Sequence, residues 1–199
     1  MHKNLKLLEK VQALFLENGA KTLTMDHIAK ELGISKKTLY EKYKNKEGLL
    51  EEVLAFGIGK ILLRLTYLEE EIDNAVERMF LRDKEITSMS TTNNSILLKQ
   101  LIQYYPRLFE RHMLEFSEKF AQIMLQNIDR GRKQGYYRDD FDPHFYATFY
   151  FQSVMSYDNS PYIDTSKLSR SEYQQEALML YMQAITTQKG RDYIKELEI

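Results

Sequence analysis

TMDHIAKELGISKKTLYEKY, residues 24–43, is the stretch that decides the fold of the first part of the chain. It predicts two short helices that cross steeply through a tight turn, which is the helix-turn-helix arrangement. Ala29 is small where the two helices approach, and Gly33 allows a turn conformation that residues with a side chain resist. Four apolar residues are expected to form the core of this motif: Ile28, Leu32, Ile34 and Leu39.

Capping residues on both sides of this stretch divide the first part of the chain into helices. Apolar residues recur at helical spacing over residues 4–18, and Gly19 follows where a left-handed C-terminal residue belongs. Thr24, Ser35 and Asn45 each stand where a side chain can cap the next helix. The expected helices are residues 25–32, residues 36–43 and a long fourth helix after Asn45.

The outer face of the third helix carries the candidate DNA contacts. A helix fits the major groove of B-DNA with its first residues at the base edges, so Lys36 and Lys37 are candidates for guanine. Tyr40, Thr24 and Lys46, with the free amides that open the fourth helix, suit phosphate oxygens. A solvated helix face is the alternative for the lysines in isolation, and the turn pattern makes it the weaker one. The full predicted set is Thr24, Ser35, Lys36, Lys37, Thr38, Tyr40, Lys44 and Lys46.

The distribution of charge agrees with a nucleic-acid-binding N-terminal part. The chain has 199 residues and a formal net charge of −1, but residues 1–50 hold ten Lys and Arg against six Asp and Glu. A basic end on an acidic remainder is typical of a DNA-binding part joined to a part with another task.

These segments resemble one known family. The similarity lies in residues 13–19 (ALFLENG), 24–29 (TMDHIA), 32–40 (LGISKKTLY) and 43–49 (YKNKEGL). They are similar to the N-terminal domain of the TetR family of bacterial regulators, and the resemblance covers about the first fifty residues. It implies an all-α homodimer that binds an inverted-repeat operator in double-stranded DNA, with a divergent helical body that senses a ligand.

Beyond residue 50 the chain also reads as all-α. Expected helices cover residues 70–86, 94–104, 106–134, 143–157, 170–187 and 190–197, with loops at 87–94 and 157–167. Few glycines and prolines favour long helices. We therefore expect two domains: a helix-turn-helix DNA-binding domain at 1–50, and an effector-binding and dimerisation domain at 51–199.

Several function classes lack their residues in this chain. There is no cysteine, and His112 and His144 stand alone without metal-ligand spacing, so neither a metal nor another cofactor is expected. No phosphate-binding, dinucleotide-binding or hydrolase motif occurs, so the chain is not expected to be an enzyme. The longest stretch without Asp, Glu, Lys or Arg, residues 143–157, is too short to span a bilayer. We expect a cytoplasmic protein with no membrane partner.

The body holds many aromatic and Met residues, most of which ordinary core packing explains. A minority can line an apolar pocket for a small hydrophobic or aromatic effector. The candidates are Tyr104, Tyr105, Phe109, Met113, Phe116 and Phe149. The family resemblance implies a repressor that such a ligand releases from DNA. The alternative is a helix-turn-helix protein with no small-molecule effector that a protein partner controls.

The last two long helices, near 143–157 and 170–187, carry more apolar residues than one inward stripe needs. A surplus of this kind marks an interface. By the family resemblance, these helices pair with their copies as a four-helix bundle in the homodimer.

Overall fold

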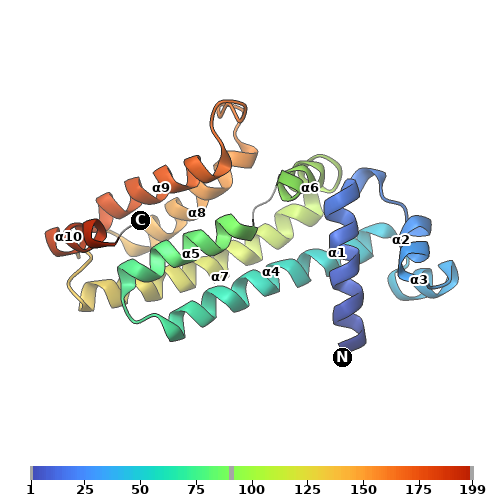
Figure 1. Cartoon of the computed structure of the whole chain (residues 1–199), viewed down its shortest axis with the longest axis horizontal. Helices are drawn as coiled ribbons and strands as arrows, with labels where there is room; N and C mark the ends of the chain where they lie inside the picture. The colour runs from blue at the N-terminus through green and yellow to red at the C-terminus, as the bar shows by residue number, and fades with distance from the viewer. Residues whose placement is uncertain (1, 90–91, 198–199) are drawn as a thin grey trace. The chain divides into compact units, whose positions relative to one another are not determined.

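The computed structural model describes residues 2–89 and 92–197, and over these residues the fold is all-α, as the sequence predicts (Figure 1). Ten helices account for the described secondary structure, apart from one isolated bridge between Tyr137 and Thr186. None of the described helices combines the length and the apolar character that crossing a bilayer requires. The chain divides into two compact units, each assembled from two separate segments.

Unit 1 comprises residues 1–60 and 91–114. Four helices lie wholly in this unit: α1 (His2–Thr22), α2 (Met25–Leu32), α3 (Lys36–Tyr43) and α6 (Thr92–Tyr104). It also contains the first parts of α4 (Lys46–Glu71) and α7 (Pro106–Lys133). Its core is formed mainly by apolar residues of α1 to α4. Leu97 and Leu101 from α6 and Leu108 from α7 are buried in the same cluster. The unit that holds the helix-turn-helix is therefore completed by residues far along the chain.

Unit 2 comprises residues 61–90 and 115–199. The rest of α4 and α7 is joined there by α5 (Ala75–Met89), α8 (Pro143–Asn159), α9 (Arg170–Ile185) and α10 (Gln188–Glu196). Its core is rich in aromatic rings: the Tyr150 and Tyr181 centroids are 4.7 Å apart, and the Phe120 and Phe151 centroids are 5.5 Å apart. Buried rings of this size remove much apolar surface from water.

Local capping explains where the helices of unit 2 begin. The Asp142 side chain accepts from the amide of His144, and Pro143 takes the first helical position of α8. At α9, Ser169 and Glu172 satisfy each other's backbone amides in a capping box. Both helices therefore begin at the predicted residues, 143 and 170.

Two of the predicted boundaries are wrong. The expected helix at 70–86 is divided, because α4 continues to Glu71 and α5 begins at Ala75. Asn74 Oδ1 accepts from the amides of Val76 and Glu77 at 2.9 and 3.1 Å and so caps α5. The expected loop at 87–94 is largely helical in its described part, since α5 runs to Met89 and α6 starts at Thr92; residues 90–91 lie outside the described part. This polar tract has no Gly or Pro, and Ser, Thr and Asn are tolerated in helices.

The compact units do not coincide with the expected domains, 1–50 and 51–199. The first unit continues into α4 and takes in α6 and the start of α7, because the Leu residues of these helices share its core. The assignment of DNA binding and effector binding to the two domains remains a prediction.

Candidate nucleic-acid interface

The turn between α2 and α3 is built as the sequence predicts. Thr24 caps α2, since its hydroxyl oxygen accepts from the amide of His27 at 3.2 Å. Gly33 has φ 65° and ends α2 in the left-handed conformation, which suits a residue without Cβ. The amide of Ile34 then donates to the Ala29 carbonyl at 3.0 Å. Ser35 caps α3 by accepting from the amide of Thr38 at 3.1 Å. The angle between the two helices is therefore fixed by local hydrogen bonds to backbone amides.

A small apolar core holds α3 in place from below. Ile28, Ala29 and Leu39 are buried, and Leu32 and Ile34 are partly buried against the same cluster. Tyr43 is buried too, and burial raises the pKa of its hydroxyl. Tyr43 is therefore part of the core, and α3 is left with one face for solvent.

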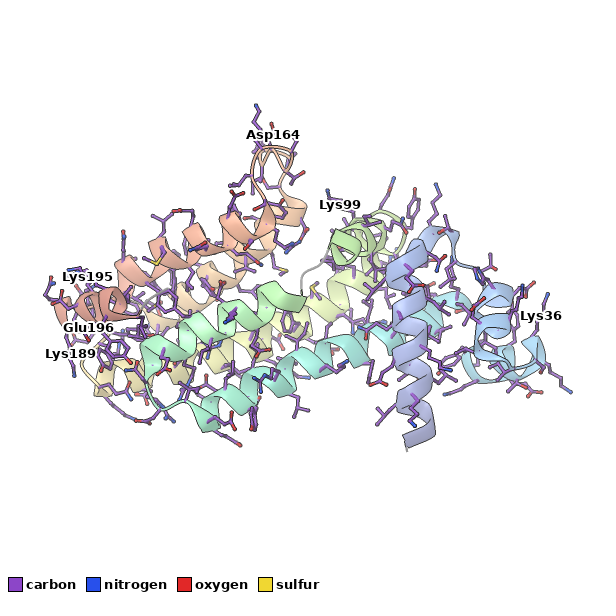
Figure 2. All side chains as sticks on the ribbon, viewed as in Figure 1. Lys36, Lys99, Asp164, Lys189, Lys195 and Glu196 are labelled. Atoms are coloured by element: carbon purple, nitrogen blue, oxygen red, sulfur yellow. The ribbon has the colours of Figure 1, made fainter. Side chains whose placement is uncertain are left out.

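That outward face carries Lys36, Lys37, Tyr40 and Lys44, all exposed. Lys36 Nζ is paired with the carboxylate of Asp26 on α2, and Figure 2 shows Lys36 projecting from the ribbon of α3. Lys37 Nζ lies 3.9 Å from Glu41 Oε1, and the Lys37 side chain is 85% exposed. Exposed pairs of this kind contribute about 0–1 kcal/mol, so a phosphate or a base edge can replace the carboxylates at little cost.

The remaining polar candidates on this face serve the turn itself. The hydroxyl oxygens of Ser35 and Thr38 lie 2.8 Å apart and share a hydrogen bond. Together with Thr24, they anchor the first turns of α2 and α3 while staying exposed. The contact of these three residues with DNA remains a prediction, whereas capping by Thr24 and Ser35 is observed.

Lys46 has a task that the sequence did not indicate. Its ammonium donates to the carbonyls of Ala20, Lys21 and Leu23 at 2.8, 3.2 and 3.1 Å. These carbonyls lie at and just beyond the C-terminus of α1, where a cation compensates the negative end of the helix dipole. Because the acceptors are 23 to 26 residues away in the chain, no local pattern reveals this contact. The proposed phosphate contact of Lys46 is untested, and this geometry does not favour it.

Gln100 on α6 is a second residue that sequence reasoning missed. Its Oε1 accepts from the backbone amide of Lys21 at 2.9 Å, across 79 residues of sequence. A Cβ on Gly19 would meet the same amide group at 2.5 Å, so α6 packs closely on the end of α1. Nothing in the neighbourhood of Gln100 in the sequence signals this partner.

The residues predicted to line a ligand pocket are divided between the two units. In unit 1, Lys21 Nζ lies 4.8 Å above the exposed Tyr104 ring, Tyr105 and Phe109 pack against the core, and Met113 is half-buried. In unit 2, Phe116 is buried beside Phe120 and Phe151, and Phe149 is 54% exposed on α8. The pocket that these residues were expected to form remains a prediction.

Unit 2 has an open cavity of about 540 Å³ with polar walls. Its lining residues are Glu69, Asp73, Gln126, Asp129, Arg130 and Lys133. Two of its cations are paired within the wall, Arg130 with Asp73 and Lys133 with Asp129. Within the part of the chain that the structure describes, no three His, Asp or Glu side chains gather as a metal site.

Comparison with known proteins agrees with this geometry. Residues 7–53 match the model of the family described as bacterial regulatory proteins, tetR family. The HTH-type transcriptional repressor KstR2 of Mycobacterium tuberculosis is 24% identical over 142 residues, which are 69% of this chain and 70% of that protein. An HTH-type transcriptional regulator of Staphylococcus aureus is 23% identical over 116 residues, or 56% of this chain. That second match spans 63% of the S. aureus protein, less than two thirds of its length.

Solved structures share the fold. A transcriptional regulator from Cytophaga hutchinsonii has a TM-score of 0.78 at 18% identity, covering 94% of this chain and 100% of that one. A regulator from Saccharomonospora viridis in complex with choline has a TM-score of 0.74 at 18% identity, with the same coverage. FadR from Bacillus subtilis in complex with stearoyl-CoA has a TM-score of 0.71 at 19% identity, covering 90% and 97%. From the family match over residues 7–53, the similar regulators and the helix-turn-helix at residues 24–43, we conclude that the N-terminal part of the chain is a DNA-binding domain of the TetR family of bacterial regulators.

Proposed function

We propose that the protein is a repressor that binds an inverted-repeat operator as a homodimer and is released by a small effector with a largely apolar body. Family membership makes it a transcriptional regulator and not an enzyme. The observation that carries the proposal is the exposed basic face of α3, held over a buried core by capped helices. Its place of action would be the cytoplasm, where the operator is.

The exposed side chains of α3 support a contact with DNA. Lys37 is the most exposed of the paired lysines and stands in the first turn of α3, which is the end that enters the major groove in helix-turn-helix proteins. Lys36 shares that turn, and Tyr40 follows one turn later with 45% of its surface exposed. In this arrangement the two lysines would contact base edges and determine specificity, and the tyrosine hydroxyl would contact the DNA phosphate backbone and fix the position of the helix.

Selection from a pool of random duplexes tests this function. We expect an enriched inverted repeat whose half-sites are about one helical turn apart, because each recognition helix occupies one major groove. Binding should weaken steeply as salt rises, since phosphate contacts release counterions. The double variant K36A/K37A is the matched loss-of-function control. Failure to enrich any duplex at low salt would refute the proposal.

Large apolar side chains of α8 and α9 are exposed on the surface, which supports a dimer interface formed by these helices. Phe145 is 62% exposed, Phe149 54% and Leu180 67%. The rings of Phe145 and Phe149 are stacked at 6.1 Å. Val154, Leu178 and Met182, apolar residues of the same two helices, are buried within unit 2. The surface available for pairing is smaller than the sequence indicates, and Met182 is a core residue.

Sedimentation of charged variants tests the dimer. Phe149→Glu and Leu180→Glu should each shift the protein toward monomer at micromolar concentration, because a charge cannot be buried unpaired at an interface. Leu63→Glu is the matched control, since Leu63 on α4 is 73% exposed but lies outside α8 and α9. Wild-type protein that sediments as a monomer, or dimers that survive both interface variants, would contradict the assignment.

Two observations support a small-molecule effector. Two proteins with the same fold were solved with small molecules, stearoyl-CoA in one and choline in the other, and unit 2 has an aromatic core of the kind that lines adaptable sites. Control by a protein partner is the alternative. A compound that raises the melting temperature and releases the operator supports the effector, whereas retention of DNA by every binding compound supports the alternative.

A further inference from the structure

Two arginines lie one helical turn apart in the core of unit 2. Arg78 and Arg82, both on α5, have no exposed surface. One carboxylate, that of Glu69 on α4, is paired with both guanidinium groups and is itself 11% exposed. A buried arginine is tolerated when its donors meet strong acceptors, and the two arginines differ in the acceptors that they have.

Arg78 is saturated with oxygen acceptors. Its Nε donates to the Ile72 carbonyl at 2.9 Å, and its Nη1 to Glu69 Oε2 at 2.6 Å and Asn127 Oδ1 at 3.5 Å. Its Nη2 donates to the backbone carbonyls of Glu69, at 3.1 Å, and Ile72. These contacts hold the α4–α5 connection together, which assigns Arg78 to the architecture of the unit.

Arg82 has a much poorer set of acceptors. Its Nη2 donates to Glu69 Oε1, but among the described residues its Nη1 contacts just the sulfur atoms of Met79 and Met124, at 2.9 and 3.1 Å. Its Nε has no hydrogen-bond partner among the described residues. A thioether is a weak acceptor, so most donors of this fully buried cation lack an oxygen.

A second buried polar group near Arg82 lacks a partner. The Tyr181 hydroxyl on α9 is buried and makes no hydrogen bond among the described residues. Burial raises the pKa of Tyr181, and the charge of Arg82 opposes that rise, which places the two groups in electrostatic contact. The neighbouring Tyr150 donates its hydroxyl to Asp83 at 3.2 Å. Among these described neighbours, the donors without an oxygen acceptor are thus those of Arg82 and Tyr181.

We propose that Arg82 and the Tyr181 hydroxyl form the binding site for the acidic group of the effector, and that the effector is an organic carboxylate with an apolar body. This inference rests on the proposed ligand-controlled function. A carboxylate supplies the oxygens that Arg82 lacks, and a guanidinium can bind it through two parallel hydrogen bonds. It also balances the charge, since two buried cations at present share one carboxylate.

The surroundings provide both a way to open the site and a place for the apolar body. Met79 and Met124 contact Nη1 through flexible, unbranched side chains that can change rotamer. Phe120, one helical turn before Met124 on α7, belongs to the aromatic cluster and is stacked on Tyr150 at 6.3 Å. An acid enters this environment only if its charge is met by Arg82, so the site selects acids over alcohols and amines of the same shape.

Matched sets of probe compounds test the charge selectivity directly. The sets are decanoic acid, decan-1-ol and decylamine, and phenylacetic acid with 2-phenylethanol and 2-phenylethylamine. Binding to the full-length protein is followed by calorimetry and thermal shift, without DNA. We expect at least one acid to bind with a dissociation constant below about 1 mM. The corresponding alcohol and amine should bind at least about 30-fold more weakly, the loss expected for an unpaired partner of a buried charge.

Two arginine variants separate binding from folding. Arg82→Met should fold with nearly unchanged stability, since a methionine packs beside Met79 and Met124 without unmet donors and Glu69 keeps its ion pair with Arg78. It should also bind the acid and the alcohol alike. Arg78→Met should lower the melting temperature, because the backbone carbonyls of Ile72 and Glu69 lose their donor and the Glu69 carboxylate loses one of its two cations. Any Arg78→Met protein that folds should keep its preference for the acid. Tyr181→Phe should fold normally and weaken acid binding about 3- to 10-fold.

The outcomes decide the inference independently of DNA binding. Preference for the acid in the wild type that is lost in Arg82→Met supports it. Absence of acid binding, equal binding of acid and alcohol, or preference retained in Arg82→Met overturns it. If acids bind through Arg82 but do not release the operator found by selection, the site stands and the ligand-controlled repressor function fails.

Discussion

Replacing Lys46 with methionine should destabilise the fold without changing the electrostatics of DNA binding. The ammonium group of Lys46 donates to three carbonyls at the end of α1, and it is only partly exposed. A cation in a partly buried position at a helix C-terminus contributes up to about 2 kcal/mol, and losing its hydrogen bonds leaves three carbonyls to water. We expect a loss of about 1–2 kcal/mol, which is a fall in melting temperature of about 2–8 °C for a chain of this size.

Lys44→Met is the matched control, because it removes the same charge two residues earlier. Lys44 ends α3 and its side chain is exposed. If Lys44 contacts a phosphate, the slope of log affinity against log salt concentration should become about 0.9 less steep, with the melting temperature unchanged. Differential scanning calorimetry and operator titrations at several salt concentrations measure both quantities for both variants. Lys46→Met protein with an unchanged melting temperature and a slope reduced by about 0.9 would refute the capping role and restore a phosphate contact.

Three further predictions follow from single positions. Lys37→Ala should relax the base preference and weaken operator binding by about 1–3 kcal/mol. Repeating the selection with this variant and titrating the selected operator measures both quantities. An unchanged base preference would show that Lys37 makes no base contact. Gly33→Ala should lower the free energy of unfolding by about 1 kcal/mol and Gly33→Asn by less, because a Cβ there meets no atom within 4 Å and only the left-handed φ is strained; equal urea midpoints for wild type and Gly33→Ala would show no strain. Burial raises the pKa of Asp83 to about 6, so between about pH 4 and 6 the folded chain keeps a proton that the unfolded chain has lost, and the free energy of unfolding falls as the pH rises. The free energy of unfolding of Asp83→Asn should exceed that of wild type by about 2 kcal/mol at pH 7.5 and should equal it at pH 4. A difference in urea unfolding that does not depend on pH would contradict the shift.

The helix-turn-helix could be predicted from sequence because its determinants are local. Gly33, Ser35 and Thr24 act on amides within a few residues of themselves, and Leu39 and Tyr43 are separated by one helical turn. Such short-range relations are fixed by backbone geometry alone. The predicted caps, turn and inward residues of this motif are therefore confirmed.

The partners of charged side chains could not be predicted, because folding brings them together from distant segments. Asp26 pairs with Lys36 across the turn, Lys46 reaches the end of α1, and Glu69 is shared by Arg78 and Arg82. In the sequence, Glu69 is one of three consecutive glutamates, a pattern that by itself indicates a solvated helix end. Tertiary packing alone selects which of the three faces inward.

The interleaved make-up of unit 1 limits how this regulator can exchange parts with its relatives. A single crossover near residue 60 would transfer the DNA-reading helices but leave behind Leu97, Leu101 and Leu108, which fill the same core. The recipient would have to provide a sixth helix of matching shape, including a side chain able to reach the amide of Lys21 as Gln100 does. Chimeras with a new operator specificity are therefore better made by grafting the exposed residues of α3 than by joining whole N-terminal segments. The same constraint means that recombination would preserve α1 and α6 as a co-inherited pair.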